Sequence, residues 1–83
     1  MSTEEISDIL EALDDIKTDP TVPKNVKIKI EEIITTLNRT DIEMSIKVDK
    51  IQQELEDISS DSNLQPFTRT QLWNVVSLLE TLN

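Results

Sequence analysis

Hydrophobic and polar positions follow the period of an α-helix in four separate stretches of the chain. Apolar residues recur three and four positions apart, which places them on one face of a helix and leaves the other face polar. The four apolar stripes are Ile6, Ile9, Leu10, Leu13 and Ile16; Val26, Ile30, Ile33, Ile34 and Leu37; Met44, Val48, Ile51, Leu55 and Ile58; and Leu72, Val75, Val76, Leu79 and Leu82. The spacing therefore predicts an all-α protein with four amphipathic helices.

The predicted helix starts carry proline or capping residues. Pro23 and Pro66 suit the beginning of the second and fourth helices, where the missing N–H of proline has no intrahelical partner to lose. Residues 2–5 and 40–43 have the S/T-x-x-E spacing of a capping box, in which hydroxyl and carboxylate oxygens accept hydrogen bonds from the first free backbone N–H groups. These signals predict short connections between the helices.

The same pattern occurs twice, 42 residues apart and without a gap. The first matched set is Ile6, Ile9, Leu13, Asp15, Ile16, Asp19 and Val22 with Val48, Ile51, Leu55, Asp57, Ile58, Asp61 and Leu64. The second is Lys27, Ile30, Ile33, Ile34 and Leu37 with Arg69, Leu72, Val75, Val76 and Leu79. A fixed period indicates a repeated structural unit. We predict a single domain, residues 1–83, with an internal repeat at 1–41 and 43–83.

Short connections make consecutive helices antiparallel, so each repeat is a helical hairpin. Two hairpins can cover each other's apolar faces, which predicts an up-down-up-down four-helix bundle. The alternative is a pair of HEAT-like repeats with an open groove, because a 42-residue unit lies in the HEAT range. The bundle is favoured because a solenoid needs at least about three units to bury its faces.

The inventory of side chains excludes most catalytic sites. The 83 residues include no His, Cys, Tyr or Gly, so the familiar bases, nucleophiles, zinc ligands and glycine-rich phosphate loops are missing. We therefore predict that the protein is not an enzyme and has no catalytic residues, no metal site and no cofactor. The alternative is a metal-dependent enzyme or metal-binding protein that uses surface carboxylates. The inward stripes are aliphatic, however, and the acids lie on the polar faces, where solvation explains them.

Asp57, Asp61 and Asn63 are spaced loosely like the ligands of a calcium loop, but the central Gly and the closing Glu are missing. Asp61 is also the counterpart of Asp19 in the other half of the chain. A shared structural role, in capping or in turn formation, explains both positions better.

Charge limits the choice of partner. The chain carries 17 acidic and 8 basic residues, a net charge of −9, which repels nucleic acid and anionic lipid. The basic cluster consists of Lys24, Lys27, Lys29, Lys47 and Lys50. It could meet phosphate or an acidic partner, but pairing with Asp15 or Asp19 is favoured. We predict no nucleic acid and no membrane among the partners. The acidic start and the lack of a membrane-length apolar run predict a cytoplasmic protein.

Several apolar residues lie off the buried stripes, among them Phe67 and Leu78, and four of them form a candidate interaction surface: Ile28, Ile42, Ile46 and Trp73. Clustered exposed apolar side chains indicate a binding surface, and Trp is enriched among interface anchors. Trp73 could instead cover the end of a thin core as a lid. The function that these residues favour is a small non-enzymatic protein-interaction module, with another protein or a second copy of the chain (a homodimer) as the partner.

The segments DPTVPKNV at residues 19–26 and TRTQLWNVVSLLE at residues 68–80 resemble an uncharacterised family of short archaeal proteins. Lys24 and Lys27 fit the basic residue that this family has after its first helical proline. The resemblance spans essentially the whole chain and implies an all-helical, four-helix protein of unknown function. It implies no activity and brings no site residues with it.

Overall fold

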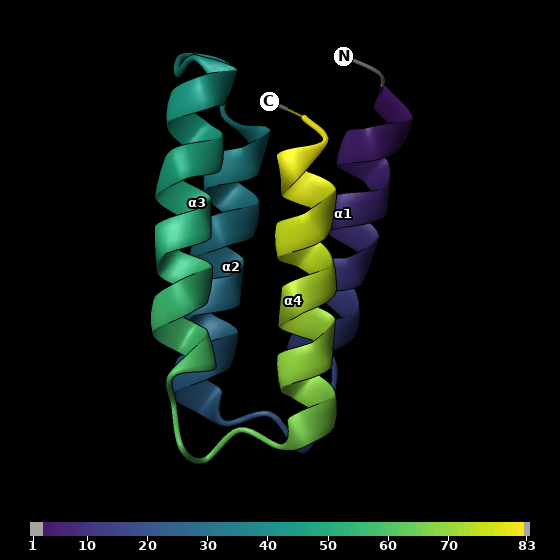
Figure 1. The fold of residues 1–83 in the computed structure, drawn as a ribbon, viewed down its shortest axis with the longest axis vertical. Coiled ribbons are helices and arrows are strands. Elements are labelled where there is room, and N and C mark those ends of the chain that lie inside the picture. The colour runs from purple at the N-terminus through teal and green to yellow at the C-terminus, as the bar shows by residue number, and fades with distance from the viewer. Residues whose placement is uncertain (1–2, 83) are drawn as a thin grey trace.

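Four helices make up the computed structural model, which describes the backbone of residues 3–82 and the side chains of residues 6–82. They are α1 (Thr3–Lys17), α2 (Lys24–Asn38), α3 (Met44–Ser59) and α4 (Pro66–Glu80). Consecutive helices run in opposite directions, and both ends of the chain lie at the same end of the molecule as the α2–α3 connection (Figure 1). No strand occurs within residues 3–82.

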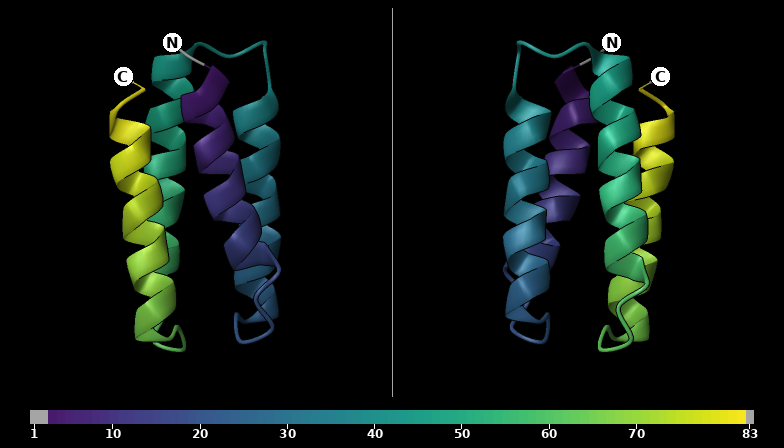
Figure 2. Two further views of the ribbon diagram at one scale, coloured as in Figure 1. Left: turned by 90° about the vertical axis from the view of Figure 1, so that its right-hand side faces the viewer. Right: turned by 90° about the vertical axis from the view of Figure 1, so that its left-hand side faces the viewer.

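The helices close into a ring. α1 packs against α2 and α4, and α3 packs against the same two helices (Figure 2). Within the described residues, no Cα atom of α1 lies within 8 Å of one in α3, and none of α2 lies within 8 Å of one in α4. Stacked HEAT-like hairpins would instead place like helices of successive units side by side. The predicted up-down-up-down four-helix bundle is therefore confirmed, and the HEAT-like alternative is wrong.

The core is built from the predicted aliphatic stripes together with Val22 and Leu64, which lie in the connections before α2 and α4. Its buried members are Ile9, Leu13, Ile16, Val22, Val26, Ile30, Ile33, Leu37, Val48, Ile51, Leu55, Ile58, Leu64, Leu72, Val75, Leu79 and Leu82. Ile6, Leu10, Ile34, Met44 and Val76, which belong to the predicted stripes, are half-buried at the edge of the core. Each lies at the margin of its stripe, where the neighbouring helix no longer covers the side chain.

Residues 42 apart occupy matching places in the two hairpins. α2 and α4 begin and end at positions that differ by this number, and each buried position of α4 is also buried in α2. The turns match too: Asp19 Oδ1 accepts the Thr21 backbone N–H at 2.9 Å, and Asp61 Oδ1 accepts that of Asn63 at 2.9 Å. Asp19 also accepts the Thr21 hydroxyl at 2.7 Å. These two hydrogen bonds from Thr21 hold the pKa of Asp19 below its ordinary value. The turn role predicted for both aspartates is confirmed.

The capping box predicted at residues 40–43 is wrong. α3 begins at Met44, its N-cap is Glu43, and no side chain caps it. Asp41 binds Arg39 instead, with Nε to Oδ1 at 2.9 Å and Nη2 to Oδ2 at 2.6 Å. This bidentate pair lowers the pKa of Asp41. The capping box predicted at residues 2–5 lies outside the described side chains.

Lys47 is buried, although the sequence placed it in the basic cluster on the surface. Only 6% of the residue is exposed, and its Nζ donates a hydrogen bond to the Leu37 carbonyl at 3.1 Å. Leu37 lies in the last turn of α2, where carbonyl groups have no partner within the helix. Lys47 therefore ties the first turn of α3 to the end of α2.

The predicted pairing of the basic cluster with Asp15 or Asp19 does not form an ion pair within 4.0 Å. Besides the hydrogen bonds from Thr21, however, the charge of Lys27 helps to lower the pKa of Asp19. Among the described residues, the ion pairs within 4.0 Å are Lys17 with Asp14 at 3.7 Å and Arg39 with Asp41 at 2.6 Å. Lys29 instead shares a small hollow with Glu32, Glu54 and Asp57. Its acidic neighbours therefore come from its own helix and from α3, which packs beside it, rather than from α1.

Candidate interaction surface on the fourth helix

Both aromatic residues of the chain are exposed on α4. The sequence has one Trp, one Phe and no Tyr. Trp73 is 70% exposed and Phe67 is 66% exposed. A small bundle with a thin core would gain from burying large aromatic side chains, since each can remove roughly 150–250 Å² from water. Their position outside the core therefore requires an explanation other than folding.

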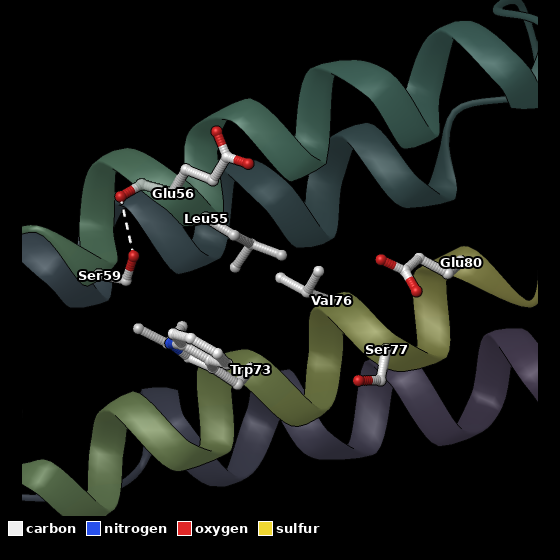
Figure 3. A pocket seen from close by; sticks show the side chains of 8 residues that line it. Leu55, Glu56, Ser59, Trp73, Val76, Ser77 and Glu80 are labelled. Carbon is white, nitrogen blue, oxygen red and sulfur yellow. Dashed lines mark hydrogen bonds between the residues drawn. The ribbon is translucent and has the colours of Figure 1, made fainter.

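A groove of about 330 Å³ runs between α3 and α4 beside Trp73. In Figure 3 the indole stands at one end of the groove, and the Leu55 and Val76 side chains point toward each other across its middle. Glu56 and Glu80 bring carboxylates to its lining. The Ser59 hydroxyl, also in the lining, donates to the Glu56 carbonyl at 2.9 Å. The groove thus has an apolar middle with acidic groups around it.

A second hollow lies on the other side of Trp73. It is lined by Arg69, Thr70 and Trp73 and measures about 290 Å³. Arg69 is half-buried, and its Nη2 donates to the Asp61 carbonyl at 2.9 Å. The indole therefore separates a groove that carries carboxylates from a hollow that carries a guanidinium.

The exposed positions of α4 are nearly free of charge. They are Pro66, Phe67, Thr70, Trp73, Asn74, Ser77 and Glu80, and only Glu80 is ionised at neutral pH. α1 is the opposite, since its exposed described positions are Ser7, Asp8, Glu11, Asp14 and Asp15. The cores of protein interfaces are depleted of charge and enriched in aromatic residues. α4 has this composition and α1 does not.

The structure does not gather the four predicted surface residues into one patch. Ile28 is half exposed and lines a different hollow, between α2 and α3. Ile46, in the first turn of α3, is also exposed, whereas Ile42, in the α2–α3 connection, is half-buried. Trp73 alone lines the α3–α4 groove. Sequence reasoning left Phe67 out of the surface, although a large apolar residue next to a helix-starting proline and off the buried stripe was a signal for it.

The described residues show no cluster suited to metal chemistry. Within that part of the chain, no group of three or more His, Cys, Asp or Glu side chains is placed to hold an ion. None of the described helices is long and apolar enough to cross a membrane.

Comparison with known proteins identifies the family. Residues 1–82 match the sequence profile of an uncharacterised protein family, UPF0147. The chain belongs to the UPF0147 family. The resemblance to an uncharacterised archaeal family of helical proteins is thereby confirmed.

Several UPF0147 proteins of archaea are similar over most of the chain. The Archaeoglobus fulgidus protein is 41% identical over 83 residues, which cover 100% of this chain and 94% of the relative. The Methanosarcina acetivorans protein is 40% identical over 81 residues, 98% of this chain and 84% of the relative. The Sulfurisphaera tokodaii protein is 34% identical over 70 residues, 84% of this chain and 79% of the relative. The names of these relatives state no activity.

Two crystal structures have the same fold. A protein of unknown function superposes with a TM-score of 0.92 at 32% identity, covering 100% of this chain and 94% of its own. A UPF0147 protein from Thermoplasma acidophilum gives a TM-score of 0.91 at 25% identity, with 96% and 94% covered. The four-helix bundle is thus the fold of this family, and its function has to be argued from the site.

Proposed function

We propose that this UPF0147 protein is a small non-enzymatic protein-interaction module that binds through the α4 surface around Trp73. The observation that carries the proposal is the exposure of both aromatic residues, Trp73 and Phe67, on one nearly uncharged helix. Covering the exposed part of an indole, roughly 150 Å², is worth about 4 kcal/mol at 25 cal/mol per Å². That is enough for one residue to dominate a modest interface.

The groups in the groove favour binding over catalysis. Its polar groups belong to Glu56, Ser59, Ser77 and Glu80. The Ser59 hydroxyl is engaged with a backbone carbonyl, and the chain has no His, Cys or Tyr to activate a nucleophile. A groove of about 330 Å³ is at the small end of ligand sites, but it suits one large apolar side chain of a partner.

Site-specific photocrosslinking in cells of the native host tests the proposal. A photoreactive amino acid replaces Ser77, which is exposed and lines the groove. The matched control replaces Thr35, the exposed residue at the same place on α2. We expect a defined protein adduct from position 77 and none from position 35. Adding Trp73→Ala should remove the adduct.

Two outcomes would contradict an α4 interaction surface. One is equal crosslinking from both positions, which would indicate random collision. The other is an adduct that persists unchanged after Trp73→Ala, which would show that the indole is not part of the contact.

A further inference from the structure

We propose that the partner seated on this surface is a second copy of the chain, with the two α4 helices antiparallel across a two-fold axis. This inference rests on the proposed function, because both use the surface around Trp73. It goes further in naming the occupant and the pairs of residues that meet.

Arg69, Trp73, Val76 and Glu80 form one stripe on α4. Their spacings of four, three and four residues keep them on one face of a helix. At 100° per residue, Arg69 and Glu80 differ by only about 20° around the helix, and they lie about 16 Å apart along it. The stripe runs along the α3 side of α4, since Trp73, Val76 and Glu80 line the α3–α4 groove. We call these four residues the α4 stripe.

The α4 stripe is complementary to itself. The midpoint of the stripe lies between Asn74 and Val75. Arg69 and Glu80 are equally far from this midpoint on opposite sides, and so are Trp73 and Val76. In an antiparallel two-fold pair, residues equally far from the axis on opposite sides face each other, and every contact occurs twice. Arg69 then faces the second copy's Glu80, and Trp73 faces the second copy's Val76. A single axis satisfies both kinds of pair.

The groove and the hollow beside Trp73 fit this pairing. Trp73 stands between the groove and the hollow that Arg69 lines. The second copy's Trp73 arrives at the level of Val76, where the groove offers Leu55 and Val76 as apolar walls (Figure 3). Each indole therefore fills the groove of the other chain. The arrangement is closed, so it ends at a dimer rather than a filament.

Charge favours a second copy in the same way. Two chains of net charge −9 repel each other, and the repulsion is smaller across α4 than across α1, whose exposed described positions carry four carboxylates. Among the exposed positions of α4 only Glu80 is ionised. The second copy's Arg69 supplies the matching cation to a groove lined by Glu56 and Glu80. Arg69 Nη2 donates to the Asp61 carbonyl, and Arg69 Nε is buried without a partner, so Nη1 carries the N–H groups that are left to meet the second copy's Glu80.

A charge-swap experiment on the purified chain tests the pairing. Analytical ultracentrifugation over a concentration series measures the dimer, and the fluorescence of Trp73, the sole tryptophan, reports burial of the groove. We expect a concentration-dependent dimer with a blue shift of the emission. Arg69→Glu and Glu80→Arg each place like charges opposite each other twice and should raise the dimer Kd by roughly tenfold.

Mixing the two variants gives the decisive result. A chain with Arg69→Glu has an acidic stripe, and a chain with Glu80→Arg has a basic one. Their heterodimer restores an opposite-charge pair at both sites, so the equimolar mixture should dimerise at least as well as the wild type. Asn38→Arg, at the place on α2 that matches Glu80, is the control and should leave the dimer unchanged. Trp73→Ala should weaken the dimer by about 30-fold or more.

Circular dichroism and melting check that each variant is folded, because Arg69 also holds the Asp61 carbonyl. Glu80→Arg leaves that hydrogen bond intact, so it tests the charge pairing by itself. A chain that stays monomeric up to millimolar concentration, or a mixture that dimerises no better than either variant, overturns the second-copy proposal. If the monomeric chain still crosslinks to another protein from position 77, the interaction proposal stands without it. If no adduct forms either, both proposals fail.

Discussion

Helices α2 and α4 are alike on the inside and different on the outside. Both have 15 residues, and four buried positions match: Val26, Ile30, Ile33 and Leu37 in α2, and Thr68, Leu72, Val75 and Leu79 in α4. Thr36 of α2 is buried as well, whereas its counterpart Leu78 is half-buried. The exposed positions of α2 are Lys24, Asn25, Ile28, Lys29, Glu31, Glu32, Thr35 and Asn38, which include four charges. Trp73 occupies in α4 the place of Glu31 in α2.

The difference between the outer faces of α2 and α4 shows which positions the fold constrains and which it does not. Packing of the bundle demands aliphatic side chains on the inner stripe, and both helices provide them. On the outer face the fold accepts either Glu or Trp at one position, so folding does not explain the tryptophan. An exposed residue that folding does not require is a candidate for recognition.

Substitutions in the core that the two hairpins share should have the largest effect on the free energy of unfolding. Ile30→Ala and Leu72→Ala each remove a fully buried side chain at the same place in the two hairpins. Each should lower the free energy of unfolding by about 2–5 kcal/mol, from lost transfer energy and the cavity left behind. Urea unfolding followed by circular dichroism measures both. A cost below about 1 kcal/mol for one of the two would show that the hairpins do not share the core equally.

A smaller loss is expected at Lys47, which belongs to the interior despite its charge. Lys47→Ala leaves the Leu37 carbonyl without its donor and should cost about 1–3 kcal/mol of unfolding free energy. Lys50→Ala, on the exposed side of the same helix, should change it by less than about 0.5 kcal/mol. Equal effects of the two substitutions in urea unfolding would argue against the buried hydrogen bond.

The turn before α2 should make stability depend on pH. Its Asp19 has a pKa below the ordinary 3.8, so the folded state favours the carboxylate. The stabilisation of the folded state by the Asp19 carboxylate is complete above the pKa of Asp19 in the unfolded chain. It disappears as the pH falls through the lower pKa that Asp19 has in the folded chain. Asp19→Asn should therefore be less stable than the wild type near neutral pH, with the difference shrinking below about pH 3.8. Urea midpoints at several pH values check this, and a difference independent of pH would contradict it.

Substitutions on the exposed faces of α2 and α4 should have the smallest effect on the free energy of unfolding. Trp73→Ala and Glu31→Ala replace exposed side chains at matching places, and each should change the free energy of unfolding by less than about 1 kcal/mol. Thermal melting of the dilute protein, below the concentration at which it associates, gives both values. A large loss for Trp73→Ala alone would mean that the indole supports the core as a lid, and the comparison of the two helices would then lose its functional meaning.

The periodicity of the sequence was enough to determine the helices and the core. An amphipathic helix has to bury its apolar stripe, so the spacing of Ile and Leu residues identified the inward face of each helix before any packing was known. Pro66 marked the first residue of α4, and Pro23 the N-cap of α2, because proline cannot lie further inside a helix. The short connections made neighbouring helices antiparallel.

The tertiary structure decided which faces meet. A stripe shows that a face is buried but not which helix buries it, so the tertiary structure was needed to show that α4 packs against both α1 and α3. A pattern of polar and apolar positions places Lys47 on the surface because its side chain is charged. It is a buried hydrogen-bond donor because the end of α2 lies beside it. Trp73 lies at the edge of the apolar stripe of α4. The periodicity is the same whether its side chain covers the core as a lid or anchors a partner. The position of α3 beside it leaves the indole exposed at the edge of a groove, because burial depends on neighbours that are distant in sequence.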